Sequence, residues 1–189
     1  LTSAVIFFRN QSPKAPSVKA SKTEGFVFEA KNKNFTAQIG ATKSPKPFIA
    51  FTSKTGSSVS MQMDATTETS IQEKDNKVSF LNVNGNTDVV YTPLANGIKE
   101  EIIINQSGEN SDYVFDIVTV NATPRKTLEG GYSRFFYDTE GRYQFHLEKP
   151  FAVDGKGVRT EEISMQIRQS KEEANKYQIA LRIRPDWLK

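Results

Sequence analysis

Residues 88–105 read Asp-Val-Val-Tyr-Thr-Pro-Leu-Ala-Asn-Gly-Ile-Lys-Glu-Glu-Ile-Ile-Ile-Asn, and this stretch decides the fold class. Two runs rich in β-branched residues flank Asn96-Gly97, a pair that accepts the positive φ angles of a type I′ turn. The stretch therefore predicts a β-hairpin. The three consecutive isoleucines, residues 102–104, predict burial on at least one face of the returning strand.

Alternation of apolar and polar residues with a period of two continues along most of the chain. Phe35, Ala37 and Ile39 are expected to share one face of a strand, and Met61 and Met63, at strand spacing, are expected to fill the core and not to form a ligand site. Turn residues separate about ten to thirteen short strands, and no segment carries a convincing helical period. The sequence predicts an all-β protein, an antiparallel β-sandwich with little or no helix.

The domain organisation follows from where this alternation begins. Residues 1–24 are expected to form an N-terminal strand and a basic linker, and residues 25–189 the β-sandwich domain. A division of the sandwich into two β lobes near residues 105–125 stays open at this stage.

The composition excludes several classes of chemistry. The 189 residues contain no Cys and one His, so thiolate catalysis, cysteine-ligated metals and His-rich metal sites are not available. No cofactor is expected, because no phosphate-binding or dinucleotide-binding glycine motif occurs. No apolar run reaches the ~20 residues that a membrane-spanning helix requires, so membrane insertion is not expected.

The net charge of +3 is distributed unevenly. Residues 1–56 carry nine basic and two acidic side chains, whereas the remainder is net acidic. Lys14, Lys19 and Lys22 are candidates for binding an anionic polymer such as cell-wall material. A solvated lysine fringe that keeps sheet edges soluble is the simpler interpretation. Nucleic acid is not an expected partner, because stacking aromatics do not alternate with the lysines.

Aromatic residues concentrate around a second expected hairpin, residues 132–147. If these aromatic side chains formed a row facing solvent, they would stack on sugar rings. Burial of the same side chains in the core is the preferred interpretation. In this hairpin Tyr143 is expected on the same face as Phe145 and Leu147, opposite His146. The candidate ligand-binding aromatics are Tyr132, Phe136, Tyr137 and Tyr143.

Carboxylates offer two further hypotheses. The turns containing Asp138, Glu140 and Asp154 present oxygen atoms that suit calcium, although such turns need no metal. A glycosidase needs two carboxylates in one cleft. The adjacent pairs Glu100-Glu101, Glu161-Glu162 and Glu172-Glu173 are instead expected to be solvated charges, so no catalytic residue is assigned.

Residues 86–91 (Asn-Thr-Asp-Val-Val-Tyr) and 96–104 (Asn-Gly-Ile-Lys-Glu-Glu-Ile-Ile-Ile) resemble a paired motif in large bacterial cell-surface proteins. These are the wall-associated, YD-repeat (RHS-type) proteins, in which the β-domain lies upstream of the repeats or of DNRLRE-type modules. Residues 136–145, 150–157 and 185–188 are similar to further motifs of that domain, in the same order. The resemblance implies a β-domain without enzymatic activity.

The resemblance leads to an expected role. The chain is expected to be a non-catalytic structural or spacer module of a bacterial protein that is secreted or exposed on the cell surface. Its expected partners are neighbouring domains of the same polypeptide. Binding of carbohydrate or cell-wall polymer, with a role in adhesion, is the alternative, and a glycosidase-type hydrolase is the second alternative.

Overall fold

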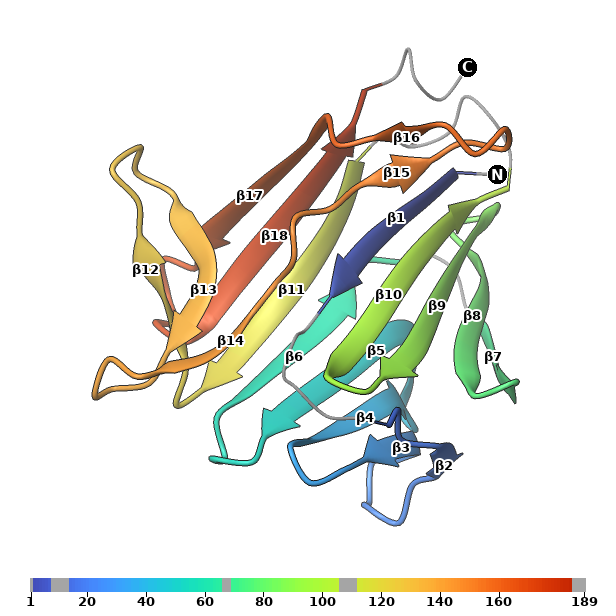
Figure 1. Ribbon diagram of the computed structural model, residues 1–189, viewed down its shortest axis with the longest axis horizontal. Coiled ribbons are helices and arrows are strands. Elements are labelled where there is room, and N and C mark those ends of the chain that lie inside the picture. The colour runs from blue at the N-terminus through green and yellow to red at the C-terminus, as the bar shows by residue number, and fades with distance from the viewer. Residues whose placement is uncertain (1, 8–13, 66–68, 106–111, 185–189) are drawn as a thin grey trace.

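The computed structural model describes residues 2–7, 14–65, 69–105 and 112–184. These residues form eighteen strands arranged in three antiparallel sheets, and no helix occurs among them (Figure 1). The prediction of an all-β antiparallel sandwich is confirmed. Since the described part of the chain has no helix, it also has none that spans a membrane.

Two large sheets form the layers of the sandwich. The seven-stranded sheet has, in order, β16 (Arg159–Thr160), β15 (Ala152–Val153), β1 (Thr2–Phe7), β10 (Gly97–Ile104), β9 (Thr87–Leu94), β8 (Lys77–Val83) and β7 (Ser70–Lys74). The eight-stranded sheet has β17 (Ile163–Gln169), β18 (Lys176–Ile183), β11 (Asp112–Val120), β6 (Ser58–Met63), β5 (Ser44–Ser53), β4 (Phe35–Ala41), β3 (Phe26–Lys31) and β2 (Val18–Ala20).

The central hairpin is β9–β10, as predicted, but its turn type differs. Leu94 pairs with Gly97, so Ala95 and Asn96 form a two-residue loop, and neither Asn96 nor Gly97 has a positive φ. The type I′ prediction is therefore wrong at this position. A two-residue turn with two positive φ angles, 52° and 62°, lies instead between β7 and β8 at Asp75-Asn76.

One hydrophobic core lies between the two large sheets. Alternate residues of the strands point inward, as the burial of Val59, Met61 and Met63 along β6 shows. The largest side chains that are fully buried come from both layers: Phe35, Phe115 and Met61 on one sheet, and Phe80 and Tyr91 on the other. The two methionines are core residues, as expected.

The N-terminal segment belongs to both sheets. β1 lies between β10 and β15, and β2, within the expected linker, pairs with β3 at the sheet edge. Asn76 connects the layers here, because its Oδ1 accepts from the Val18 amide (2.6 Å) and its Nδ2 donates to the Pro16 carbonyl (3.2 Å). The buried cluster also includes residues on both sides of 105–125. The structure therefore packs these segments around one core.

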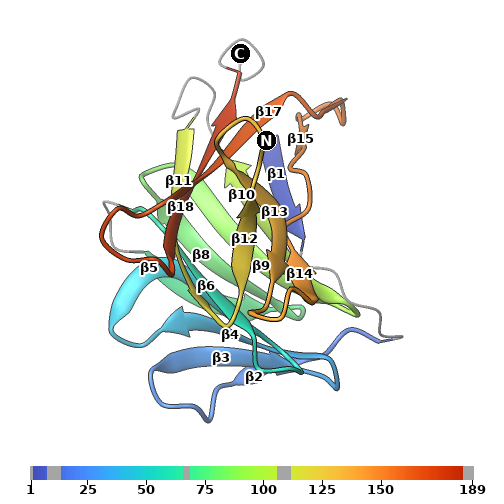
Figure 2. The same cartoon turned by 90° about the vertical axis from the view of Figure 1, so that its left-hand side faces the viewer.

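The third sheet closes one side of the sandwich. It consists of β12 (Thr123–Lys126), β13 (Tyr132–Tyr137) and β14 (Tyr143–His146). Figure 2 shows it between the β11–β18 side of one large sheet and the β1–β15 side of the other. Phe136, Phe145 and Leu147 are buried in the shared core. This packing leaves the opposite face of the small sheet directed away from the core.

Candidate binding site

The turn between β13 and β14 is fixed by a buried carboxylate. Asp138 is 8% exposed, and its Oδ1 accepts the backbone amides of Glu140 and Arg142, each at 2.9 Å. Its Oδ2 accepts Arg142 Nε at 2.8 Å and Gln144 Nε2 at 2.9 Å. The Arg142 side chain first, and then the backbone amides of Arg142 and Glu140, lower the pKa of Asp138 below its ordinary value.

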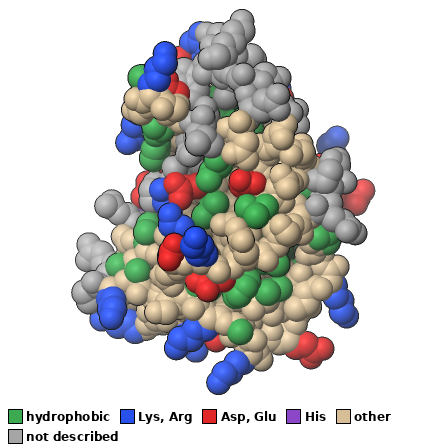
Figure 3. Space-filling view, turned by 90° about the vertical axis from the view of Figure 1, so that its right-hand side faces the viewer, with side chains coloured by type: hydrophobic (Ala, Val, Ile, Leu, Met, Phe, Trp, Pro, Cys, Tyr) green, Lys and Arg blue, Asp and Glu red, His purple; other side chains and the backbone are tan. Residues whose placement is uncertain are grey.

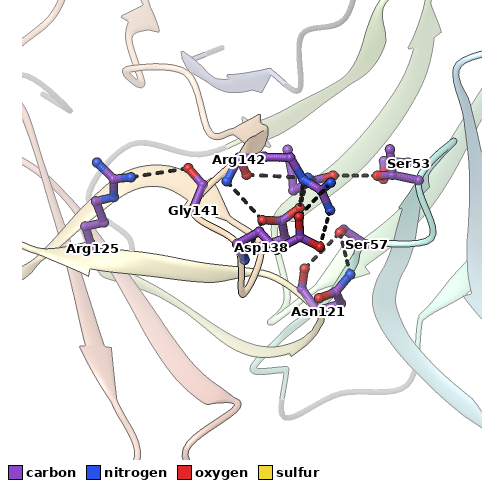
Figure 4. A network of polar contacts seen from close by, with 10 residues as sticks. Ser53, Ser57, Asn121, Arg125, Asp138, Gly141 and Arg142 are labelled. Carbon is purple, nitrogen blue, oxygen red and sulfur yellow. Dashed lines mark hydrogen bonds and ion pairs between the residues drawn. The ribbon is translucent and has the colours of Figure 1, made fainter.

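The same network fastens the turn to the rest of the molecule (Figure 4). Gln144 Oε1 accepts the Thr55 hydroxyl, which also hydrogen-bonds to Ser53 in β5 at 2.7 Å. Nearby, Ser57 donates its hydroxyl to the Asn121 carbonyl at 2.8 Å. The small sheet is thus connected through side chains to the β5–β6 turn.

A β-bulge in β14 decides which aromatic rings face outward. Phe136 pairs with Phe145, whereas the next residue, Tyr137, pairs with Tyr143, so Gln144 is an extra residue in β14. The bulge reverses the orientation that strict alternation gives to the start of β14. Tyr143 therefore lies with Tyr137 and His146 and not with Phe145, which corrects the sequence-based assignment of its face.

Four rings form a continuous row on the outer side of the small sheet, and we call this row the aromatic face: Phe135, His146, Tyr143 and Tyr137. Phe135 stacks on His146 with centroids 5.2 Å apart and an interplanar angle of 26°. The His146 ring lies 5.9 Å from Tyr143, and Tyr143 lies edge-on to Tyr137 at 6.2 Å. Phe135 is 40% exposed and Tyr143 47%, so apolar ring surface is available to solvent.

Charged groups surround the aromatic face. The Arg125 guanidinium lies 3.7 Å above the Tyr137 centroid, and that of Arg134 lies 5.7 Å from the Phe135 centroid. His146 uses both ring nitrogens, since Nδ1 bonds to the Tyr143 hydroxyl and Nε2 lies 3.1 Å from Glu148 Oε1. Partial burial, followed by the charge of Glu148, raises the pKa of Tyr143, so its hydroxyl stays protonated at neutral pH.

The other predicted aromatics have different surroundings. Phe136 is fully buried and stacks on Phe145, with centroids 5.0 Å apart, so it is a core residue and not a ligand-binding one. Tyr132 is half-buried, packs edge-on against Tyr177 and donates its hydroxyl to Gln169 Oε1 at 2.6 Å. Of the four aromatic candidates, only Tyr137 and Tyr143 belong to the aromatic face.

The candidate lysines lie at the other side of the molecule. Lys14, Lys19 and Lys22 are exposed on and around β2, at the edge of the eight-stranded sheet that is farther from β12–β14 in Figure 1. Figure 3 shows separated Lys and Arg side chains along the level of the molecule at which β2–β4 lie. The lysines and the aromatic face therefore do not form one site.

The carboxylates considered as calcium ligands accept hydrogen bonds from groups of their own turns. Asp138 is saturated by its turn, and Asp154 accepts two backbone amides, those of Lys156 and Val158, at 2.8 Å each. Within the described ranges no three His, Asp or Glu side chains form a group that suits a metal ion. Two surface grooves among the described residues each have one carboxylate in their lining, Glu129 in one and Asp112 in the other. Neither groove thus has the carboxylate pair of a glycosidase.

Glu100 is the ionisable residue whose solvent exposure was predicted wrongly from the sequence. It was expected at a solvated edge, but it is 1% exposed and lies directly opposite Tyr91. Tyr91 donates its hydroxyl to Glu100 Oε1 at 2.8 Å, whereas Oε2 has no hydrogen-bond partner among the described residues. Burial raises the pKa of Glu100 to about 7, and the Tyr91 hydrogen bond opposes that shift. The remaining acidic pairs at 161–162 and 172–173 are exposed, as expected.

Comparisons of this chain with family models, with curated proteins and with solved structures find no match. The resemblance to bacterial wall-associated proteins consequently stays a prediction.

Proposed function

We propose that this chain is a non-catalytic module of a secreted or surface-exposed bacterial protein and that its aromatic face binds carbohydrate. The observation that carries the proposal is the outward row of Phe135, His146, Tyr143 and Tyr137 on a small sheet whose other face packs into the core. Flat, exposed rings stack on the apolar faces of sugars, and adjacent hydroxyl and guanidinium groups donate to sugar oxygens.

Pre-organisation supports this assignment. The β13–β14 turn is fixed by Asp138, and the bulge at Gln144 is bonded to Thr55, so the rings need little ordering on binding. Phe135 and Tyr143 are the most exposed rings of the row and supply its principal contact area. Arg125 and Arg134 flank the row and favour glycans that carry anionic groups.

The test is a binding measurement on purified protein with soluble fragments of cell-wall glycan. Phe135→Ala and Tyr143→Ala should each weaken binding about tenfold, because each removes one stacking surface. Val120→Ser and Val158→Ser are matched controls, since both remove an exposed apolar side chain outside the aromatic face. Equal effects of all four substitutions, or no binding of any soluble glycan fragment, would contradict the proposal.

A structural spacer role is the second candidate, and one observation favours it. A shared buried cluster and the Asp138 and Asn76 networks connect all three sheets, which suits a module that transmits position between neighbouring domains. A spacer of this kind unfolds in one cooperative transition. Separate unfolding of β12–β14, detected by hydrogen exchange of their amides, would contradict the spacer role.

A further inference from the structure

The large sheets end in four edge strands that differ in how well they are protected. β16 has two residues, β2 three and β7 five, and β2 and β7 contain charged side chains such as Lys19 and Lys74. β17 is the longest edge, with seven residues, Ile-Ser-Met-Gln-Ile-Arg-Gln, of which only Arg168 is charged. Proteins usually shorten or charge their free edges to prevent pairing with other chains. β17 lacks this protection.

The backbone groups on the free side of β17 can be identified from its pairing. The Ser170 amide donates to the Lys176 carbonyl at 2.9 Å, which makes 170–176 a hydrogen-bonded pair. Because such pairs alternate along an antiparallel ladder, Gln166 and Arg168 direct their amides toward β18. Met165, Ile167 and Gln169 therefore direct their N–H and C=O groups toward the unpaired side.

That side opens into a groove and not onto a flat surface. A cavity of about 720 Å³ follows seven consecutive residues, 165–171, and its other wall comes from Thr127 and residues 129–132. Tyr132 holds the two walls together through its hydrogen bond to Gln169. A strand in a sheet occupies about 160 Å³ per residue, from a spacing of ~4.8 Å, a layer distance of ~10 Å and a rise of ~3.4 Å. The groove thus has room for about four or five residues of one strand.

The side chains along the groove specify what such a strand should contain. Met165 is half-buried and packs against the core, so an inward-facing residue beside it should be apolar. Arg168 and Lys171 are exposed and form no ion pair among the described residues, and Glu129 is the one acidic residue of the lining. The outward-facing residues should therefore be acidic. Leu128, at the tip of the adjoining wall, is fully exposed and adds an apolar contact for a polypeptide partner.

We propose that β17 binds an extended segment of another polypeptide, with alternating apolar and acidic residues, as an added strand of the eight-stranded sheet. The carrying observation is the coincidence of three unpaired backbone positions, a strand-sized groove and a positive rim along one edge. Backbone pairing supplies the affinity in this mode, and the alternate side chains supply the specificity. None of the groove residues belongs to the aromatic face, so the two proposals stand or fall separately.

The probe is a blocked synthetic peptide of alternating valine and glutamate, added to isotope-labelled protein. We expect amide exchange at Met165, Ile167 and Gln169 to slow about tenfold or more on saturation, while the β2 edge at Val18–Ala20 is unchanged. Arg168→Glu combined with Lys171→Glu should weaken peptide binding about tenfold through the loss of two ion pairs. Lys19→Glu with Lys22→Glu is the matched control at the other edge.

Four results would overturn the proposal. The first is that the peptide leaves the three amides unprotected. The second is that the same peptide with a central proline protects them equally. A soluble glycan fragment protects them in place of the peptide, which would assign the groove to sugar. Protection at high protein concentration without peptide would assign the edge to a second copy of this chain.

Discussion

Glu100 and Asp138 are both carboxylates that folding removes from solvent, yet their pKa values shift in opposite directions. Glu100 lies in the central hairpin between the large sheets and accepts one hydrogen bond, from Tyr91. Asp138 lies in the turn of the small sheet and accepts two backbone amides, an arginine and a glutamine. The pKa of Glu100 is raised to about 7, and that of Asp138 is lowered.

The difference shows that hydrogen-bond donors, and not solvent exposure, decide the charge state of these two carboxyl groups. Each hydrogen bond to an ionised oxygen replaces water that folding removed, and the positive Arg142 side chain adds attraction for Asp138. The two carboxylate oxygens of Glu100 together receive only one hydrogen bond in place of the lost water, so desolvation has the larger effect on its pKa. Asp138 consequently stabilises its turn as an anion, whereas Glu100 is best accommodated in its protonated form.

Replacing Glu100 by Gln should produce the largest effect on stability. Because the folded pKa of about 7 exceeds the ordinary 4.5, wild-type protein loses stability as the pH rises between these values. The variant lacks this loss, so the difference in unfolding free energy between wild type and variant should change by about 3 kcal/mol from pH 4 to pH 8. Urea denaturation across this range measures it. Glu101→Gln is the control, because Glu101 is partly exposed and paired with Lys99, and parallel pH profiles for wild type and Glu100→Gln would contradict the buried-acid interpretation.

Removing the Tyr91 hydroxyl should have the next largest effect. Tyr91→Phe leaves Glu100 without its hydrogen bond and should lower the free energy of unfolding by about 1–3 kcal/mol, more at pH 8 than at pH 5. A double-mutant cycle with Glu100→Gln isolates the pair. Additive effects of the two substitutions would show that the hydroxyl and the carboxyl do not interact in solution.

The opposite pH profile is expected for Asp138→Asn. The lowered pKa of Asp138 contributes stability at neutral pH that is lost as the pH falls below the ordinary value of 3.8. The variant should therefore melt below wild type at pH 7, and the gap should close near pH 2. Asp154→Asn is the matched control, since Asp154 holds its turn with two backbone amides only. A gap that persists at pH 2 would argue against the anionic role.

The smallest effect should come from the bulge residue. Gln144→Ala removes the bonds to Asp138 and Thr55, and we expect a loss of about 0.5–1.5 kcal/mol together with faster amide exchange in β14. Gln178→Ala, which removes an exposed bond to Asp116, is the control. Unchanged exchange in β14 would show that the bulge is held by core packing alone.

Alternation of residue types was sufficient to predict the fold class. It identified the central hairpin and the inward faces of strands such as β6, because a strand with one buried face has apolar residues at every second position of its sequence. It underestimated the number of strands, since β15 and β16 have two residues each and are too short to show a period. The type of the central turn was predicted wrongly, because turn type depends on backbone angles that Asn and Gly permit but do not impose.

The candidate site was only partly predictable. The clustering of aromatics near residues 132–147 was visible in the sequence. The bulge at Gln144, whose side chain bonds to Asp138 and to the distant Thr55, was not, and it reverses the side that spacing assigns to Tyr143. The burial of Glu100, in contrast, had a sequence signal. It alternates with Ile98, Ile102 and Ile104 on the inward face of β10, and its adjacency to Glu101 obscured this pattern.

The place of β1 in the seven-stranded sheet has a consequence for biosynthesis. Thr2 pairs with Ile104, and Ser3 with Val153, so both neighbours of this first strand emerge about 100 and 150 residues later. At ~5–20 residues per second, the strand waits about 10–30 s before its second neighbour exists. Such distant pairings give a high contact order and slow folding. The nascent chain therefore completes this part of the sheet only about 150 residues after β1 is made, and until then the edge of β1 that receives β15 is open to chaperones or to neighbouring chains.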